Sequence, residues 1–215
     1  MKGREKENMS IWFTADTHAG HSNIIRYAHR PFANVDEMDA TLIRNWNERI
    51  GDHDDVYHLG DLMFRLSRKR AEEVLGQLRG RIHLVRGNHD RGIEQYKDRF
   101  VWIKDLAEVK VQDAGAPGGV QRIMLCHYAM RVWKHSHHGS FHLYGHSHGS
   151  LPEDPNSRSF DVGVDARGYA PMSYDEVKAL MAKKTFVPLD HHGDEVLQEE
   201  MRLMRADALE GMEGS

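Results

Sequence analysis

The sequence predicts an α/β protein, and three features carry that prediction. Short apolar runs with the length of buried strands alternate with amphipathic helical segments in the first half of the chain. Strand-like runs then cluster in the second half, and several runs end directly in Asp, Asn or His. An all-β barrel would lack the helical segments and a helix bundle would lack the strands, so neither class fits.

Strands are predicted wherever a short run of bulky apolar residues lies between polar turns. In chain order they cover residues 11–15, 56–59, 82–86, 101–103, 109–111, 120–126, 141–144 and 160–164. The glycine-rich stretch 113–119 between two of them is expected to form a turn or loop. The polar residues that follow these runs therefore fall at strand ends.

Helices are predicted from apolar spacing and from capping residues. Segment 36–50 has one apolar face at four-residue spacing, formed by Met38, Leu42, Trp46 and Ile50. Ser67 is expected to cap a second helix that ends near Leu78. Ser173 and Glu176 form a capping-box pattern, which predicts a further helix to about Lys184.

The length of the chain suits one domain with short appendages. Residues 1–10 are charged and lack the apolar core of a signal peptide, so they are interpreted as a tail. Residues 11–190 are expected to form the domain, and residues 191–215 a C-terminal helical appendage, because one face repeats Leu197, Met201, Met204 and Ala208. This helix could pack on its own domain or on a partner, and a homo-oligomer stays possible.

Composition excludes several function classes. The formal charge of −4, from 29 Lys and Arg against 33 Asp and Glu, does not indicate a nucleic-acid-binding surface, although nucleic acid remains possible as a substrate. No apolar run approaches the ~20 residues of a membrane-spanning helix, so no membrane contact is predicted. The single cysteine, Cys126, excludes an intrachain disulfide and fits a cytoplasmic location.

Five polar clusters follow apolar runs, and their Asp, Asn and His side chains bind divalent metals through oxygen and nitrogen. They are Asp16-Thr17-His18, Gly60-Asp61, Gly87-Asn88-His89-Asp90, His127 and Gly145-His146-Ser147-His148. Each cluster alone is compatible with a simple polar turn. Their repeated position after apolar runs predicts instead a single metal site at one edge of a sheet.

Asp61 is the candidate bridge between two cations. Two dications about 3.5–4 Å apart repel each other, and a carboxylate between them offsets that repulsion. Asp16 and His18 can converge on one ion at a strand end, and His146 and His148 can point into one cavity.

The third cluster offers groups with different roles. Asn88 can give a carbonyl oxygen to a metal, whereas His89 is expected to project over the substrate. Asp90 is expected to hydrogen-bond to His89 and hold its orientation. A lone His127 after a strand is more often structural when it is considered by itself.

Four residues near the clusters are expected to contact substrate: His21, Arg26, Tyr128 and Arg131. The first two follow the first cluster, where the alternative is a solvated loop. The other two begin the long segment 128–139, where aromatic and basic groups suit a nucleotide or an aryl phosphate. The alternative for that segment is a surface loop with a packed Trp133.

The motif order Asp-x-His, Gly-Asp, Gly-Asn-His-Asp, His, Gly-His-x-His resembles the calcineurin-like metallophosphoesterase superfamily and spans residues 16–148. Residues 12–21 and 30–32 are similar to a small group of bacterial and phage predicted phosphoesterases. The resemblance implies a four-layer α/β/β/α sandwich with a dinuclear site at the sheet edge. It does not imply one particular substrate.

The resemblance also implies a role for each motif residue. The first metal would be held by Asp16, His18, Asp61 and His148. The second metal would be held by Asp61, Asn88, His127 and His146. His89 would contact the scissile phosphate and protonate the leaving group.

The expected activity is hydrolysis of phosphate mono- or diesters by an activated water. The oxygen and nitrogen ligands favour Mn²⁺, with Fe and Zn²⁺ as other possibilities. Two alternatives stay open: a dinuclear hydrolase that acts on amides or other non-phosphate esters, and a metal-binding interaction protein without turnover.

Overall fold

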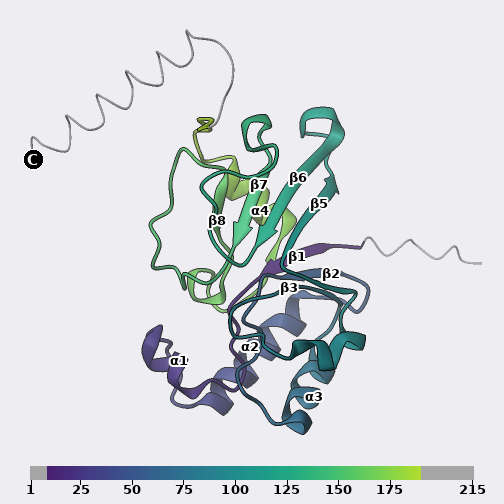
Figure 1. Cartoon of the computed structure of the whole chain (residues 1–215), viewed down its shortest axis with the longest axis vertical. Helices are drawn as coiled ribbons and strands as arrows, with labels where there is room; N and C mark the ends of the chain where they lie inside the picture. The colour runs from purple at the N-terminus through teal and green to yellow at the C-terminus, as the bar shows by residue number, and fades with distance from the viewer. Residues whose placement is uncertain (1–8, 190–215) are drawn as a thin grey trace, which may run out of the picture.

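The computed structural model describes residues 9–189, which form two β-sheets (Figure 1). The first sheet has the strand order β4-β3-β2-β1-β9. Its strands are β1 (Ile11–Thr14), β2 (Asp55–His58), β3 (Arg81–Val85), β4 (Trp102–Lys104) and β9 (Met172–Ser173). The second sheet has the order β5-β6-β7-β8. Its strands are β5 (Leu106–Gln112), β6 (Val120–Cys126), β7 (Phe141–Tyr144) and β8 (Ser159–Asp161).

Both sheets are mainly parallel. Strands β1 to β4 run parallel, and only β9 pairs antiparallel with β1. In the second sheet β6, β7 and β8 run parallel, and β5 forms an antiparallel hairpin with β6. The carboxyl ends of several strands therefore meet at a common edge.

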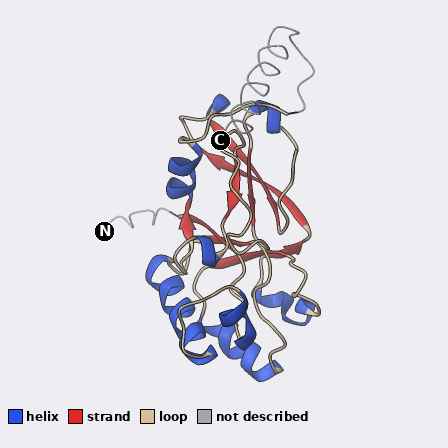
Figure 2. Ribbon diagram, turned by 90° about the vertical axis from the view of Figure 1, so that its left-hand side faces the viewer, coloured by secondary structure: helices blue, strands red, loops and turns tan. Residues whose placement is uncertain are grey.

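In the described part of the chain, four α-helices accompany the sheets: α1 (Ser22–Tyr27), α2 (Val35–Arg49), α3 (Arg68–Gln77) and α4 (Tyr174–Met181). Side chains cap the last three, because Asn34, Ser67 and Ser173 each accept a backbone N–H of the first turn. The predicted capping box of Ser173 and Glu176 is present. Helices α1 to α3 lie on one side of the first sheet (Figure 2).

Two hydrophobic clusters hold the sheets and helices together as layers. One lies between the sheets and includes Phe13, Leu125 and Phe160, with Val177 of α4. The other packs α2 and α3 against the first sheet, and includes Trp46, Val56, Leu75 and Leu84. Because strands β2 and β3 contribute to both clusters, the first sheet is covered on both faces, as parallel sheets require.

The predicted α/β class with two stacked sheets is confirmed, and most elements lie where the sequence indicated. The strand predicted over 160–164 is shorter, because Val164 opens a 3₁₀ helix. Helix α1, strand β9 and the 3₁₀ helix η1 (Ile93–Arg99) were not predicted. No helix of the described residues is long and apolar enough to cross a membrane. The predicted appendage over 191–215 lies outside the described residues.

Candidate metal centre

The predicted ligands lie on loops at the carboxyl ends of parallel strands, the edge where open α/β sheets bind ligands. The loop after β1 carries Asp16 and His18, and the loops after β2, β3, β6 and β7 carry Asp61, Asn88, His127, His146 and His148. Backbone hydrogen bonds join these loops: His18 N donates to Asp61 O at 2.9 Å, and Gly145 N donates to His127 O at 3.0 Å. The fold thus brings both sheets to one polar centre.

Asp16, His18 and His148 form a first group whose ligand atoms lie within 4.8 Å of one another. Asp16 Oδ1 and His18 Nε2 are buried and have no hydrogen-bond partner among the described residues. A buried polar atom without a partner costs about 1–3 kcal/mol, which a bound cation would offset. The residues of this group therefore fit a divalent metal.

Asp61, His127 and His146 form a second group, again with ligand atoms within 4.8 Å. Asn88 Oδ1 joins it, 3.1 Å from His127 Nε2 and 3.0 Å from His146 Nδ1. His127 Nδ1–H donates to the carbonyl of Leu59 at 2.7 Å, which leaves Nε2 as a lone pair toward the group. Ligands about 2.1 Å from one ion and at right angles lie about 3 Å apart, so these distances suit a shared cation.

Asp61 connects the two groups. Its Oδ2 lies 3.4 Å from His18 Nε2 and 3.5 Å from His127 Nε2. Its Oδ1 accepts the backbone N–H of His89 at 2.8 Å. Burial raises the pKa of Asp61, but the neighbouring His127 ring and the hydrogen bond from the His89 backbone outweigh that effect and lower the pKa to about 2. An ionised carboxylate with one oxygen facing both groups fits a bridging ligand.

The electrostatics of the first group also favour a cation. Burial raises the pKa of Asp16 well above its ordinary value, and the nearby Asp161 and Asp61 carboxylates add to the rise. Burial lowers the pKa of His18 to about 2, which keeps the imidazole neutral and able to ligate. A bound dication would reverse the penalty for ionising Asp16.

Arg30 and Asp165 support the first group, and the sequence analysis did not identify either as a site residue. Asp165 Oδ2 accepts a hydrogen bond from His148 Nδ1 at 2.6 Å, so Nε2 of His148 is the free ligand atom. The buried Arg30 donates to both Asp165 oxygens at 2.8 Å. It also donates to the carbonyls of Asp16 and Thr17. Arg30 thus fixes the β1 loop and the orientation of His148 together.

Backbone strain is concentrated in the ligand residues. Asp16, His18, Asp61, His146 and His148 have φ of 58°, 50°, 56°, 67° and 48°. Non-glycine residues rarely adopt this left-handed region, and such strain clusters at functional sites, where the surrounding structure maintains it. The fold therefore holds these side chains in directions that a relaxed turn would not give.

Two glycines allow the second group to form. A Cβ on Gly60, whose φ is 98°, would lie 2.6 Å from His127 Nδ1. A Cβ on Gly87 would lie 2.2 Å from Asp61 Oδ1. Any side chain at either position would displace a ligand, which explains why glycine precedes Asp61 and Asn88.

Asp90 has a different role from the predicted one. Its Oδ2 accepts the backbone N–H groups of Asp61 and Gly87, both at 2.8 Å, and its Oδ1 accepts that of Leu62 at 2.9 Å. The expected hydrogen bond to the His89 ring is replaced by these backbone contacts. Asp90 therefore joins the β2 and β3 loops, and acts on the site through the position of Asp61.

His89 lies at the mouth of the site. Its side chain is exposed, and its ring centroid is 5.3 Å from that of His18 and 5.1 Å from that of Phe64. It belongs to neither ligand group. This position beside the ligands suits a residue that meets the substrate.

Of the four predicted substrate contacts, two lie against the ligand groups. His21 stacks on Phe64 at 3.8 Å between ring centroids, and its Nδ1 is 3.4 Å from His18 Nδ1. Tyr128 is half-exposed, and its ring centroid lies 4.8 Å from that of His146 and 5.0 Å from that of His127.

The other two predicted contacts lie farther out. Arg26 is exposed and stacks over Tyr27 at 5.2 Å, and Tyr27 in turn lies 6.3 Å from the His21 ring. Arg131 lines a separate cleft with Trp133 and Phe186. Trp133 is itself buried and donates to Ser140, so segment 128–139 is a loop with a packed Trp133.

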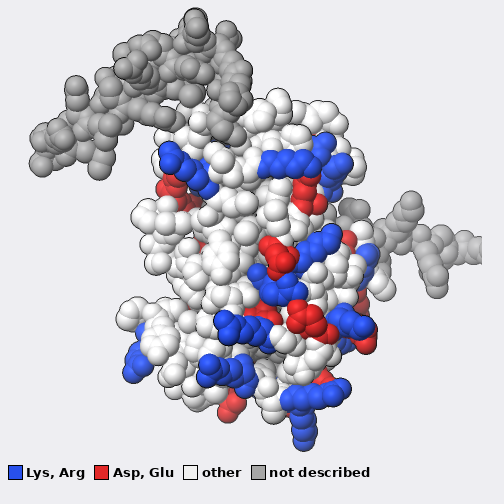
Figure 3. Space-filling model, viewed as in Figure 1, with Lys and Arg blue, Asp and Glu red and all other residues white. Residues whose placement is uncertain are grey.

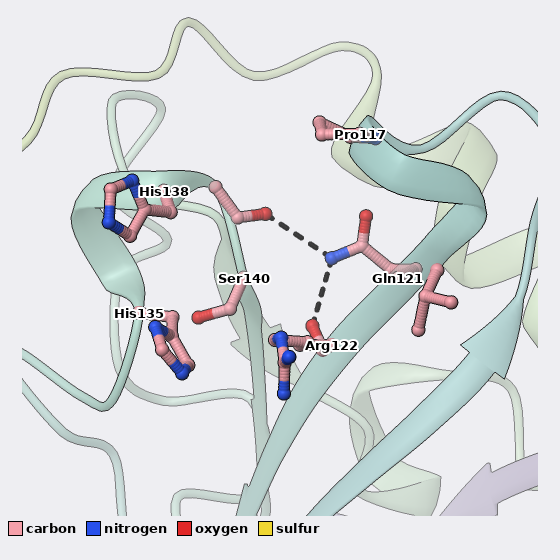
Figure 4. A pocket seen from close by; sticks show the side chains of 8 residues that line it. Pro117, Gln121, Arg122, His135, His138 and Ser140 are labelled. Carbon is pink, nitrogen blue, oxygen red and sulfur yellow. Dashed lines mark hydrogen bonds between the residues drawn. The ribbon is translucent and has the colours of Figure 1, made fainter.

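A cavity of about 280 Å³ lies away from the ligand groups, at the start of β6 (Figure 4). Gln121 Nε2 donates to the carbonyls of Arg122 and Gly139 at its wall. His135 and His138 also line it. Within residues 9–189 these histidines belong to no group of three converging ligand atoms.

Surface charge agrees with the composition. Basic and acidic side chains are interspersed over the face drawn in Figure 3, with no continuous basic field. Many arginines are neutralised locally, as Arg49 is by Glu176 and Arg86 by Glu94. This face does not have the charge distribution of a duplex-binding surface.

Comparisons with known proteins agree with the motif order. A model of the calcineurin-like phosphoesterase superfamily domain matches residues 9–160. The uncharacterised protein MJ1445 of Methanocaldococcus jannaschii is 34% identical over 179 residues, covering 80% of this chain and 92% of that protein. The gene 66 protein of Mycobacterium phage D29 is 30% identical over 198 residues, covering 80% and 96%.

A solved structure shares the fold. A protein of unknown function, AQ665 from Aquifex aeolicus, superposes with a TM-score of 0.60 at 23% identity, over 80% of this chain and 100% of that one. At this identity the similarity supports the architecture alone.

Proposed function

The chain belongs to the calcineurin-like phosphoesterase superfamily, and from that premise we propose that it is a dinuclear metal-dependent phosphoesterase that hydrolyses phosphate mono- or diesters. One observation carries the dinuclear part of the proposal. Asp61 Oδ2 lies 3.4 Å from a ligand atom of one group and 3.5 Å from a ligand atom of the other. A carboxylate between the two ligand groups could bind both cations and offset the repulsion between them, as a metal pair requires.

The residues present would divide between two ions. The first ion would be held by Asp16, His18, His148 and Asp61. The second would be held by Asp61, Asn88, His127 and His146. These donors are all oxygen and nitrogen, which suits Mn²⁺ first, with Fe or Zn²⁺ as alternatives.

When bound, such ions would neutralise phosphate oxygens and lower the pKa of an attacking water. The chain's own contribution is positioning and proton transfer. Asp165 and Arg30 hold His148 in place, and Asp90 holds the loop that carries Asp61. The exposed imidazole of His89 delivers a proton to the leaving oxygen, a role that suits its position beside His18.

The test is one panel on the purified full-length chain. Metal content is measured first, as isolated and after incubation with Mn²⁺. Turnover is then measured on an aryl phosphate monoester, an aryl phosphate diester, cyclic nucleotides and oligonucleotides, with amide and lactone substrates alongside. About two equivalents of metal and turnover confined to phosphoesters are the expected results.

Two outcomes would contradict the proposal. Turnover of amides or lactones without any phosphoester would favour a different dinuclear hydrolase. Two bound metals with no turnover of any phosphoester would favour a metal-binding interaction protein.

A further inference from the structure

We propose that a groove beside His89 binds a second phosphate, carried by the leaving group of the substrate. The groove is lined by Arg65, Leu66, His89, Arg91, Gln95 and Tyr96 among others, and we call it the His89 groove. It adjoins the residue to which we assign leaving-group protonation. The inference rests on the proposed phosphoesterase function and adds a substrate class to it.

The two arginines of the groove have no acidic partner within residues 9–189. Among the described residues, neither Arg65 nor Arg91 forms an ion pair, whereas Arg79 and Arg81 pair with Asp52 and Asp55. The guanidinium of Arg65 lies 5.2 Å over the Phe64 ring, which leaves its N–H groups available. Guanidinium groups bind phosphate in a bidentate manner, so two of them without acidic partners favour binding of an anion.

The acidic residue in the lining does not cancel this charge for a ligand. Both oxygens of the buried Asp90 are occupied by backbone N–H groups of Asp61, Leu62 and Gly87. Glu94, the next acid along the chain after Asp90, pairs with Arg86. The groove is therefore lined by two arginines without an ion pair and by no free carboxylate among its described lining residues.

The wall that carries Arg65 is held in place. Arg65 has a φ of 48°, in the left-handed region that non-glycine residues rarely adopt. The preceding residues are tied to the β1 loop, because Phe64 N donates to Ala19 O at 3.0 Å and Ala19 forms a bridge with Met63. Strain maintained by such contacts is typical of functional loops.

The size of the groove limits the ligand. It has a volume of about 80 Å³, against the roughly 10–15 Å³ that one water occupies. Several water-sized groups fit, which is enough for a phosphate. Because His89 lines this groove, the second phosphate belongs to the part of the substrate that leaves.

The experiment compares substrates that differ only by one phosphate. For diester hydrolysis these are the thymidine dinucleotide TpT and its two terminally phosphorylated forms, pTpT and TpTp. For monoester hydrolysis they are 3-hydroxypropyl phosphate and propane-1,3-diol bisphosphate. Each pair is measured with the wild type, Arg65→Gln, Arg91→Gln and the control Arg44→Gln. Arg44 is an exposed arginine of α2 without an ion pair in the described chain, and it does not line the groove.

The expected result is a kcat/KM roughly tenfold higher for one doubly phosphorylated substrate than for its matched partner, through a lower KM. That ratio should fall toward one in Arg65→Gln and in Arg91→Gln, and should persist in Arg44→Gln. A ratio near one in the wild type, or an equal ratio in all variants, overturns the second-phosphate site. Absence of turnover on every phosphoester, aryl esters included, overturns the proposed function itself.

Discussion

Histidines of two different kinds lie near the two ends of strand β6. At its carboxyl end, His127 is 1% exposed and its Nδ1–H is fixed on the carbonyl of Leu59. At its start, His135 and His138 line an open cavity, and their ring centroids lie 6.1 Å apart (Figure 4). Only the first end belongs to a group of converging ligand atoms in the described chain.

The difference shows what turns a histidine into a ligand. Abundance does not, because the segment 135–138 holds three histidines in four residues. At the metal centre, His18 and His127 are buried, and a second hydrogen bond fixes the tautomer of His127 through Leu59 and of His148 through Asp165. If this distinction holds, variants at the centre should lose metal or turnover, whereas variants of the exposed histidines should not.

Removing the bridge should have the largest effect. Asp61→Asn keeps the size of the side chain but removes the charge that faces both groups. We expect loss of at least one bound metal and a fall in kcat/KM of more than roughly 10³-fold, because cation stabilisation is worth several kcal/mol. Metal analysis and turnover on the best phosphoester measure both. Full metal content and activity would show that Asp61 does not bridge.

His89→Ala should separate chemistry from metal binding. Loss of a proton donor costs about 10²–10⁴-fold in rate, while both ligand groups remain complete because His89 belongs to neither. The measurement is kcat at saturating metal together with metal content. If His89→Ala loses metal as Asp61→Asn does, His89 is a ligand and the proposed proton transfer is wrong.

A third kind of histidine is buried but not at the site. His142 of β7 accepts the N–H of Met130 on Nε2 and donates from Nδ1 to the carbonyl of Met124, so its ring is neutral. Burial lowers its pKa to about 4, against about 6.5 in an unfolded chain. Between these values only the unfolded state binds the proton, so stability is intact above pH 6.5 and falls as the pH drops toward 4.

The expected loss from His142 alone is about 3 kcal/mol across that window. Urea unfolding at a series of pH values measures it. In His142→Gln the free energy of unfolding should depend less steeply on pH, by the equivalent of about one proton. In His137→Gln, which replaces an exposed histidine, this dependence should not change. An unchanged slope in His142→Gln would mean that His142 is protonated in the folded protein.

The support of His148 should matter less than the bridge. Asp165→Asn removes the carboxylate that accepts from His148 Nδ1. Loss of such a partner weakens metal affinity about 10–100-fold, and the unpaired Arg30 should also lower the melting temperature. Titration of the metal-free protein with Mn²⁺ measures the affinity. Glu153→Gln, which breaks the more exposed ion pair with Arg167, is the control and should bind metal normally.

The role of Asp165 could not be predicted from the sequence, unlike the positions of the ligands. The seven predicted ligands all followed a strand directly, so a strand prediction was enough to place them at one edge. Arg30 and Asp165 are 135 positions apart and meet only because α1 and the segment after β8 fold against the β1 loop. The partners of Asp90 are backbone N–H groups, which carry no sequence signal. Strand ends were predictable, whereas contacts between distant loops were not.

The smallest effect should come from the exposed histidines of the 3₁₀ segment Ser136–His138. His137 and His138 are exposed, and their rings contact each other at 4.1 Å without joining a ligand group in the described chain. The double variant His137→Ala and His138→Ala should change the free energy of unfolding by less than about 0.5 kcal/mol, as surface substitutions do. Its metal content and kcat/KM should match those of the wild type. If this variant loses metal, exposed histidines contribute to binding, and the fixed tautomer at the other end of β6 is not what selects the ligands.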